Sequence, residues 1–219
     1  MSIQSNLEKI RKTLPQHITL VAVSKTKPIA DLEEAYQAGQ RVFGENKIQE
    51  MTQKWEVLPK DIEWHMIGHV QRNKVKYMAP YVSLVHGVDS FRLLKEIDKQ
   101  GQKNNRVINC LLQMHIAEED TKFGLDSSEL SEILGSEEFQ QLRHINVIGL
   151  MGMATYTDNE AQLHREFKAL KSQFDLLQKK LPEAKTLSIG MSGDYKIALE
   201  EGSTMVRIGS SIFGAREYN

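Results

Sequence analysis

The chain carries the stretch ITLVAVSKTKP at residues 18–28. Its apolar part is rich in β-branched residues and is followed by a proline, a pattern typical of a buried strand. Lys25 comes directly after this strand. Burying a lysine as a cation is costly, so desolvation at this place favours a neutral amine, which can attack a carbonyl group. The ordinary alternative is a lysine that simply begins the solvated turn after the strand.

Composition limits the classes of protein that this chain can represent. Its 219 residues are 40% hydrophobic and 26% charged, typical of a globular protein with one sizeable core. We expect residues 1–219 to form a single domain, because the 5 Pro and 14 Gly are scattered and no linker is visible. A net charge of −1 indicates no nucleic-acid or membrane surface, and no apolar stretch is long enough to span a bilayer.

The compartment is predicted from the cysteine content and the N-terminus. The N-terminal residues are polar and lack the apolar region of a signal peptide. Cys110 is the only cysteine, so no intrachain disulfide can form, and it lies in an apolar run where a buried, inert thiol is expected. These features together favour the cytoplasm.

Short apolar runs alternate with longer amphipathic stretches along the chain, which predicts strands joined by helices. This alternation favours a parallel sheet, and eight repeats favour a (β/α)8 TIM-type barrel with an extra N-terminal helix at residues 5–14. An open doubly wound sheet is the alternative. The predicted strands are 18–23, 41–43, 63–66, 82–86, 107–114, 147–150, 186–189 and 205–208. The predicted helices are 29–38, 46–58, 70–78, 90–99, 127–134, 159–180, 195–200 and 210–213.

Two loops near the end of the chain have the composition of phosphate-binding loops. The segment GSTMVRIGSSIFG at residues 202–214 reads as a strand, a glycine turn and a helix start, with the amide of Ser210 pointing outward. The preceding loop, within SIGMSGD at residues 188–194, adds further hydroxyl and amide donors. Barrels often bind phosphate after strands seven and eight. For either loop alone, ordinary turn residues remain the alternative.

Arg207 lies inside the last apolar run, where an unpaired charge is disfavoured. It either pairs with a carboxylate for structural reasons or faces the barrel mouth and a ligand. A lysine near a phosphate cradle, together with an internal arginine, indicates pyridoxal 5′-phosphate (PLP), with a Schiff base on the lysine and the arginine at the pyridine nitrogen. The histidines and the cysteine show no metal-ligand spacing, and structural roles are favoured for His86 and His115.

Six motifs run in order across nearly the whole chain. They read AVSKTKP at 22–28, FGEN at 43–46, WHMIG at 64–68, GLM at 149–151, LSIGMS at 187–192 and GSTMVRIG at 202–209. Together they resemble the motifs of the pyridoxal phosphate homeostasis proteins, which are single-domain relatives of the N-terminal barrel of bacterial alanine racemase. The set is highly specific, although each motif alone is weak.

The resemblance implies a monomeric barrel that binds PLP on Lys25 and has Arg207 as the partner of the pyridine nitrogen. It implies phosphate contacts from Ser192, Gly209 and Ser210.

It further implies that Asn46 and His65 line the mouth near the ring and that Met191 belongs to the phosphate loop. The implied role is intracellular cofactor homeostasis, by buffering or delivery without substrate turnover. We therefore expect no catalytic residue, no metal, and apo PLP-dependent enzymes as partners besides the cofactor.

Two enzymatic alternatives stay open from the residues. A small PLP-dependent amino-acid racemase would need a second base opposite Lys25. In alanine racemase that base is a tyrosine from another domain, which we expect to be absent because the sequence ends six residues after Phe213. Tyr156 and Tyr195 lie near barrel loops, but their spacing does not place either one across from the lysine. The other alternative is a sugar-phosphate enzyme in which Lys25 attacks a ketone.

Overall fold

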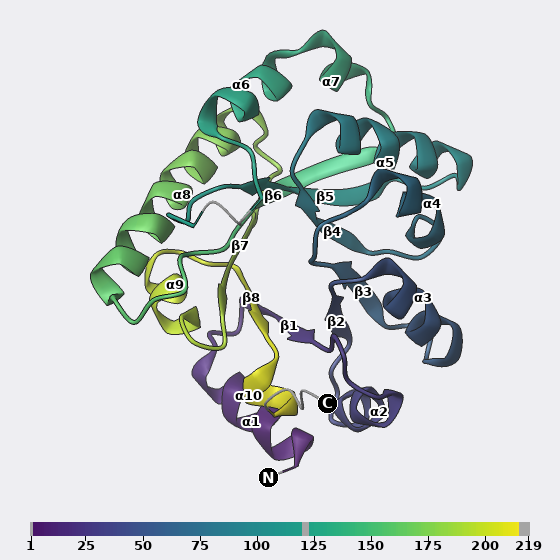
Figure 1. The fold of residues 1–219 in the computed structure, drawn as a ribbon, viewed down its shortest axis with the longest axis vertical. Helices are drawn as coiled ribbons and strands as arrows, with labels where there is room; N and C mark the ends of the chain where they lie inside the picture. Colours follow the sequence, from purple (N-terminus) through teal and green to yellow (C-terminus); the bar gives the residue numbers. More distant parts are fainter. Residues whose placement is uncertain (1, 120–122, 215–219) are drawn as a thin grey trace.

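Eight parallel strands close into a barrel in the computed structural model, which describes residues 2–119 and 123–214. Each strand pairs with the next, and β1 pairs with β8, so the strands form a ring with the helices outside it (Figure 1). The predicted (β/α)8 barrel is thereby confirmed, and the open sheet is excluded. The strands are β1 (Thr19–Val23), β2 (Val42–Glu45), β3 (Glu63–Met66), β4 (Leu84–Val88), β5 (Ile108–Met114), β6 (Ile145–Gly152), β7 (Thr186–Met191) and β8 (Met205–Ile208).

The predicted extra helix is present as α1 (Ile3–Thr13) and lies beside α10 (Ser210–Phe213), as Figure 1 shows. Asn6 Nδ2 joins these two helices by donating to the carbonyl oxygen of Ile212 at 2.9 Å. No helix within the described residues is both long enough and apolar enough to cross a membrane. The remaining helices are α2 (Ile29–Gln37), α3 (Ile48–Val57), η1 (Arg72–Lys74), α4 (Val75–Met78), α5 (Phe91–Lys103), α6 (Ser127–Gly135), α7 (Glu137–Gln141), α8 (Glu160–Lys180) and α9 (Tyr195–Glu200).

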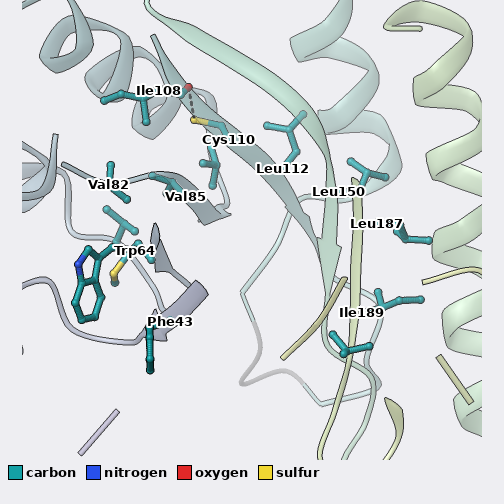
Figure 2. Close-up of a cluster of buried hydrophobic side chains, with 14 of the residues drawn as sticks. Phe43, Trp64, Val82, Val85, Ile108, Cys110, Leu112, Leu150, Leu187 and Ile189 are labelled. Carbon is teal, nitrogen blue, oxygen red and sulfur yellow. Dashed lines mark hydrogen bonds between the residues drawn. The ribbon is translucent and has the colours of Figure 1, made fainter. Parts of the chain in front are cut away.

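The main hydrophobic core lies between the outward face of the barrel and the helices. Side chains alternate between the two faces of a strand, so every second residue contributes to this layer. Figure 2 shows part of it, including Phe43, Trp64 and Cys110. The Cys110 thiol is fully buried and unoxidised, and its Sγ lies 3.6 Å from the carbonyl oxygen of Ile108.

The interior of the barrel holds a smaller apolar cluster. TIM barrels are filled by layers of inward-pointing side chains rather than left hollow. Polar side chains of β3, β4, β7 and β8 occupy buried positions beside this cluster, so part of the barrel interior is polar. The apolar members of the interior cluster are Val21, Leu84, Leu111, Met151 and Met205.

Pairing of the first and last strands brings the two ends of the chain together at one rim. Val21 lies opposite Arg207 and Ala22 lies opposite Ile208. The next inward position of β1, Val23, contacts Gly209, where an added Cβ would lie only 3.1 Å from the Val23 carbonyl oxygen. A glycine at residue 209 therefore allows the ends of β1 and β8 to approach closely.

Trp64 provides a test of the outward core. Its side chain is fully buried, and its Nε1 has no hydrogen-bond partner among the described residues. Trp64→Ala should lower the free energy of unfolding by about 3–5 kcal/mol, since it leaves a large cavity. Trp64→Phe should cost less than Trp64→Ala, because the phenyl ring fills part of the cavity and no indole hydrogen bond is lost. Urea unfolding measures both values, and equal losses would contradict this description of the site.

Candidate functional site

Lys25 lies just beyond the carboxyl end of β1, at the rim where active sites of such barrels are found. Val21 of β1 faces the barrel interior, and Val23, two residues before the lysine, contacts Gly209. The Lys25 side chain is half-buried. The chain turns at the next residue, Thr26, which has a φ of +63°. The lysine thus lies two residues beyond the contact between Val23 and Gly209.

The loops after β7 and β8 meet at the same rim. The amide of Gly209 donates to Ser192 Oγ at 3.3 Å, which joins the two loops directly. Met191, the last residue of β7, lies opposite Arg207 in the strand register. Ser210 is exposed and begins α10, so its amide has no acceptor within that helix. Hydroxyl and amide donors from both loops therefore surround one part of the rim.

Arg207 is buried inside the barrel and reaches toward β6 and β7. Its Nη1 donates to the carbonyl oxygen and to Oγ of Ser188 at 2.7 and 2.6 Å, and its Nη2 donates to the carbonyl oxygen of Gly152 at 3.0 Å. These bonds use three of the five guanidinium N–H groups. Within the described parts of the chain no carboxylate hydrogen-bonds to it, so two N–H groups remain for a ligand acceptor.

The charge of Arg207 persists despite its burial. Desolvation lowers the pKa of Arg207 to about 10, and the nearby carboxylate of Asp194 opposes that change. The guanidinium is therefore a cation at neutral pH and can face an acceptor that carries no proton.

A chain of hydrogen bonds continues from Arg207 across the barrel. Ser188 Oγ lies 3.1 Å from His86 Nδ1, and His86 Nε2 lies 3.0 Å from His65 Nδ1. All four side chains are buried, and they come from β8, β7, β4 and β3. The sequence predicted site roles for Arg207 and His65, favoured only a structural role for His86, and assigned Ser188 no role of its own. The inward parity of Ser188 and His86 in their predicted strands was the signal that could have placed them in this chain.

The charge of Arg207 fixes the direction of the first bond, in which Ser188 Oγ accepts from the guanidinium. One proton lies between His86 Nε2 and His65 Nδ1, so the tautomer of one ring sets the tautomer of the other. Burial keeps both rings neutral, because it lowers the pKa of His65 to about 3 and that of His86 well below its ordinary value.

Asn46 follows β2 and is half-buried at the same rim. The chain after β3 packs tightly against it, since a Cβ added at Gly68 would lie 2.5 Å from the carbonyl oxygen of Asn46. His115, by contrast, is exposed, and its Nε2 lies 3.2 Å from the carbonyl oxygen of Glu119. The described residues contain no cluster of side chains suited to a metal ion.

The fold and this rim define the class of the protein as a barrel of the alanine racemase N-terminal type. The family model for "Alanine racemase, N-terminal domain" matches residues 1–217. A relative from Pasteurella multocida is 37% identical over 235 aligned residues, which cover 100% of both chains. One from Aquifex aeolicus is 40% identical over 201 residues, covering 91% of this chain and 87% of the relative. Both relatives are named pyridoxal phosphate homeostasis protein, and this chain belongs to that family.

A solved structure resembles this barrel closely. PipY of Synechococcus elongatus, described with PLP bound, superposes with a TM-score of 0.88 at 33% sequence identity. The match covers 97% of this chain and 100% of PipY.

The buried histidines predict a stability loss in acid. An unfolded histidine binds a proton near pH 6.5, whereas His65 in the fold does so only near pH 3. Between these values the unfolded state binds more protons, so stability should fall as the pH falls, by up to about 1.4 kcal/mol per pH unit for each such histidine. His65→Asn should make this dependence shallower in urea titrations at several pH values. His17→Asn, at an exposed position, is the matched control, and equal slopes for all three proteins would contradict the prediction.

Proposed function

We propose that this chain binds PLP at the carboxyl rim of the barrel, holds it as a Schiff base on Lys25, and buffers or delivers it inside the cell. The observation that carries the proposal is the β1–β8 pairing, which brings a half-buried lysine beside two loops of hydroxyl and amide donors. The name of the relatives and the PLP-bound PipY structure support it.

The residues of the rim fit such a ligand. PLP has an aldehyde, an anionic phosphate and a pyridine nitrogen, and the rim has a lysine, a set of neutral donors and a cation with spare N–H groups. We infer that Ser192, Gly209 and Ser210 bind the phosphate, with Met191 shaping the start of that loop. Phosphate binding by backbone amides and hydroxyls is common after strands seven and eight of this fold.

Arg207 is proposed to donate to the pyridine nitrogen and to keep it unprotonated. Since bonds to Ser188 and Gly152 hold the guanidinium in place, the direction of its two remaining N–H groups is fixed before a ligand arrives. Asn46 and His65 are proposed to line the ring. The Lys25 amine would attack the aldehyde carbon of bound PLP, forming a C=N bond while the carbonyl oxygen leaves as water with both amine hydrogens.

We propose a carrier without substrate turnover rather than a racemase. Among the described tyrosines, Tyr156 is 95% exposed, and Tyr195 Oη lies 3.1 Å from Thr13 Oγ1 of α1, outside the barrel. Neither arrangement supplies a second base opposite Lys25. The free, buried thiol of Cys110 is compatible with a cytoplasmic protein, and we further propose a monomer of one domain with apo PLP-dependent enzymes as partners.

Visible absorption tests the cofactor proposal. Purified protein incubated with PLP should be yellow, and borohydride should fix the label on Lys25, as peptide mass mapping would report. Lys25→Ala and Lys25→Arg should both lose the visible band, because neither side chain can form the C=N bond. A band of unchanged intensity in both variants would contradict the assignment of Lys25. A colourless wild type that binds a sugar phosphate would favour the ketone-attacking enzyme instead.

The absence of turnover is tested with amino-acid enantiomers. Protein loaded with PLP should racemise L-alanine no faster than free PLP does at the same concentration, since neither Tyr156 nor Tyr195 supplies a second base opposite Lys25. Chiral chromatography over time measures the reaction. Rapid interconversion that is lost in Lys25→Ala would overturn the carrier and favour the racemase.

A further inference from the structure

A buried ionic cluster lies directly behind Lys25, on the outward side of the barrel wall. Lys54 of α3 donates from Nζ to Glu45 Oε1 at 2.8 Å and to Glu50 Oε1 at 2.7 Å. Glu45, the last residue of β2, is fully buried, and the Lys54 side chain is 6% exposed. We call Glu45, Glu50 and Lys54 the ionic clamp.

The ionic clamp holds the backbone on both sides of Lys25. Before the lysine, Lys54 Nζ donates to the carbonyl oxygen of Ser24 at 2.8 Å, and Ser24 Oγ donates to Glu45 Oε1 at 2.6 Å. After it, the amide of Thr26 donates to Glu50 Oε1 at 2.6 Å. The Ser24 side chain is buried and contacts Glu45, so the clamp holds this segment from the helix side of the barrel wall.

Thr26 shows that this segment is constrained. Its φ of +63° lies in the left-handed region, which is uncommon for a β-branched residue. Such a conformation persists only where the surroundings determine it, and the bond from the Thr26 amide to Glu50 is a contact that does so. The bond to Glu50 therefore fixes the backbone conformation directly after Lys25.

Stability of the fold does not explain a charged cluster at this place. The apolar stripe of α3 continues from Ile48 and Met51 to Lys54, where an apolar residue would pack against the sheet without desolvating charges. Replacing a buried ion pair by apolar side chains is often neutral or stabilising. Burial raises the pKa of the Glu45 carboxyl group, and the positive charge of Lys54 opposes this rise. The charged form of Glu45 therefore depends on Lys54.

We propose that Glu45, Glu50 and Lys54 are positioning residues that hold the backbone on both sides of Lys25 and thereby direct its amine into the barrel mouth. This inference rests on the proposed function, because it assumes that Lys25 forms the covalent link to PLP. None of the three side chains is proposed to touch the cofactor.

The test compares variants by PLP titration, visible absorption and borohydride labelling of Lys25. Glu50→Ala removes the acceptor of the Thr26 amide, whereas Glu50→Gln keeps an oxygen there. Lys54→Met combined with Glu45→Gln removes two charges together, so no unpaired charge stays buried. Lys171→Met is the matched control, because Lys171 and Asp175 form an i,i+4 pair like Glu50 and Lys54 but on the exposed surface of α8.

Glu50→Ala and the double variant should bind PLP about tenfold more weakly, the equivalent of one charge-assisted hydrogen bond. Their labelling of Lys25 at equal occupancy should be slower. Glu50→Gln should restore most of both properties, and Lys171→Met should match the wild type. Circular dichroism and thermal unfolding identify variants that have not folded. If the double variant does not fold, Glu50→Ala alone tests the positioning role, because Glu50 is partly exposed.

Two failures can be told apart. If the wild type shows no visible band and no label on Lys25, the proposed function fails. If the wild type is labelled and folded Glu50→Ala binds and labels within about twofold of it, a change too small for a lost hydrogen bond, the positioning role is overturned. Equal weakening in Glu50→Ala and Glu50→Gln would also overturn it, because the retained oxygen would then have no effect.

Discussion

Pairing between β1 and β8 closes the barrel, and the arrangement of the side chains at the carboxyl rim depends on it. Hydrogen bonding along these strands puts Val21 opposite Arg207, although the two residues are far apart in the sequence. The glycine at residue 209 lets the strand ends approach, so the lysine that follows β1 emerges beside the loops that follow β7 and β8. An amine, two loops with hydroxyl and amide donors, and an internal cation thereby lie at one end of the barrel.

Strand number and order could be predicted from sequence because they depend on local patterns, whereas element ends depend on tertiary contacts. The predicted strand at 82–86 is found at Leu84–Val88, and the helix predicted at 70–78 divides into η1 and α4. No helix was predicted for the short α7, although Ser136 before Glu137 is a typical helix start. The predicted helix at 90–99 runs on to Lys103. A Cβ at Gly101 would lie 2.6 Å from the carbonyl oxygen of His144, so this glycine lets α5 pack closely against the segment before β6.

Candidate residues of the rim could be proposed from the sequence where their chemistry is unusual for their surroundings. A lysine after a buried strand and an arginine within one were both visible in the sequence, and the structure brings them to one end of the barrel. The partners that orient them were not visible. Ser188 and His86 act through contacts between different strands, and Lys54 contacts a segment 30 residues earlier. Such pairings are fixed by the closed topology, which no short motif encodes.

The buried sulfur of Cys110 has a consequence for handling and for physiology. It lies between β5 and the surrounding helices, and burial raises the pKa of its thiol, so almost no thiolate forms in the folded state. Alkylating reagents and peroxides act on thiolates, and they can reach this atom only when the barrel wall opens. The rate at which a maleimide modifies Cys110 therefore reports how often the barrel wall opens, and no engineered probe is needed to measure it.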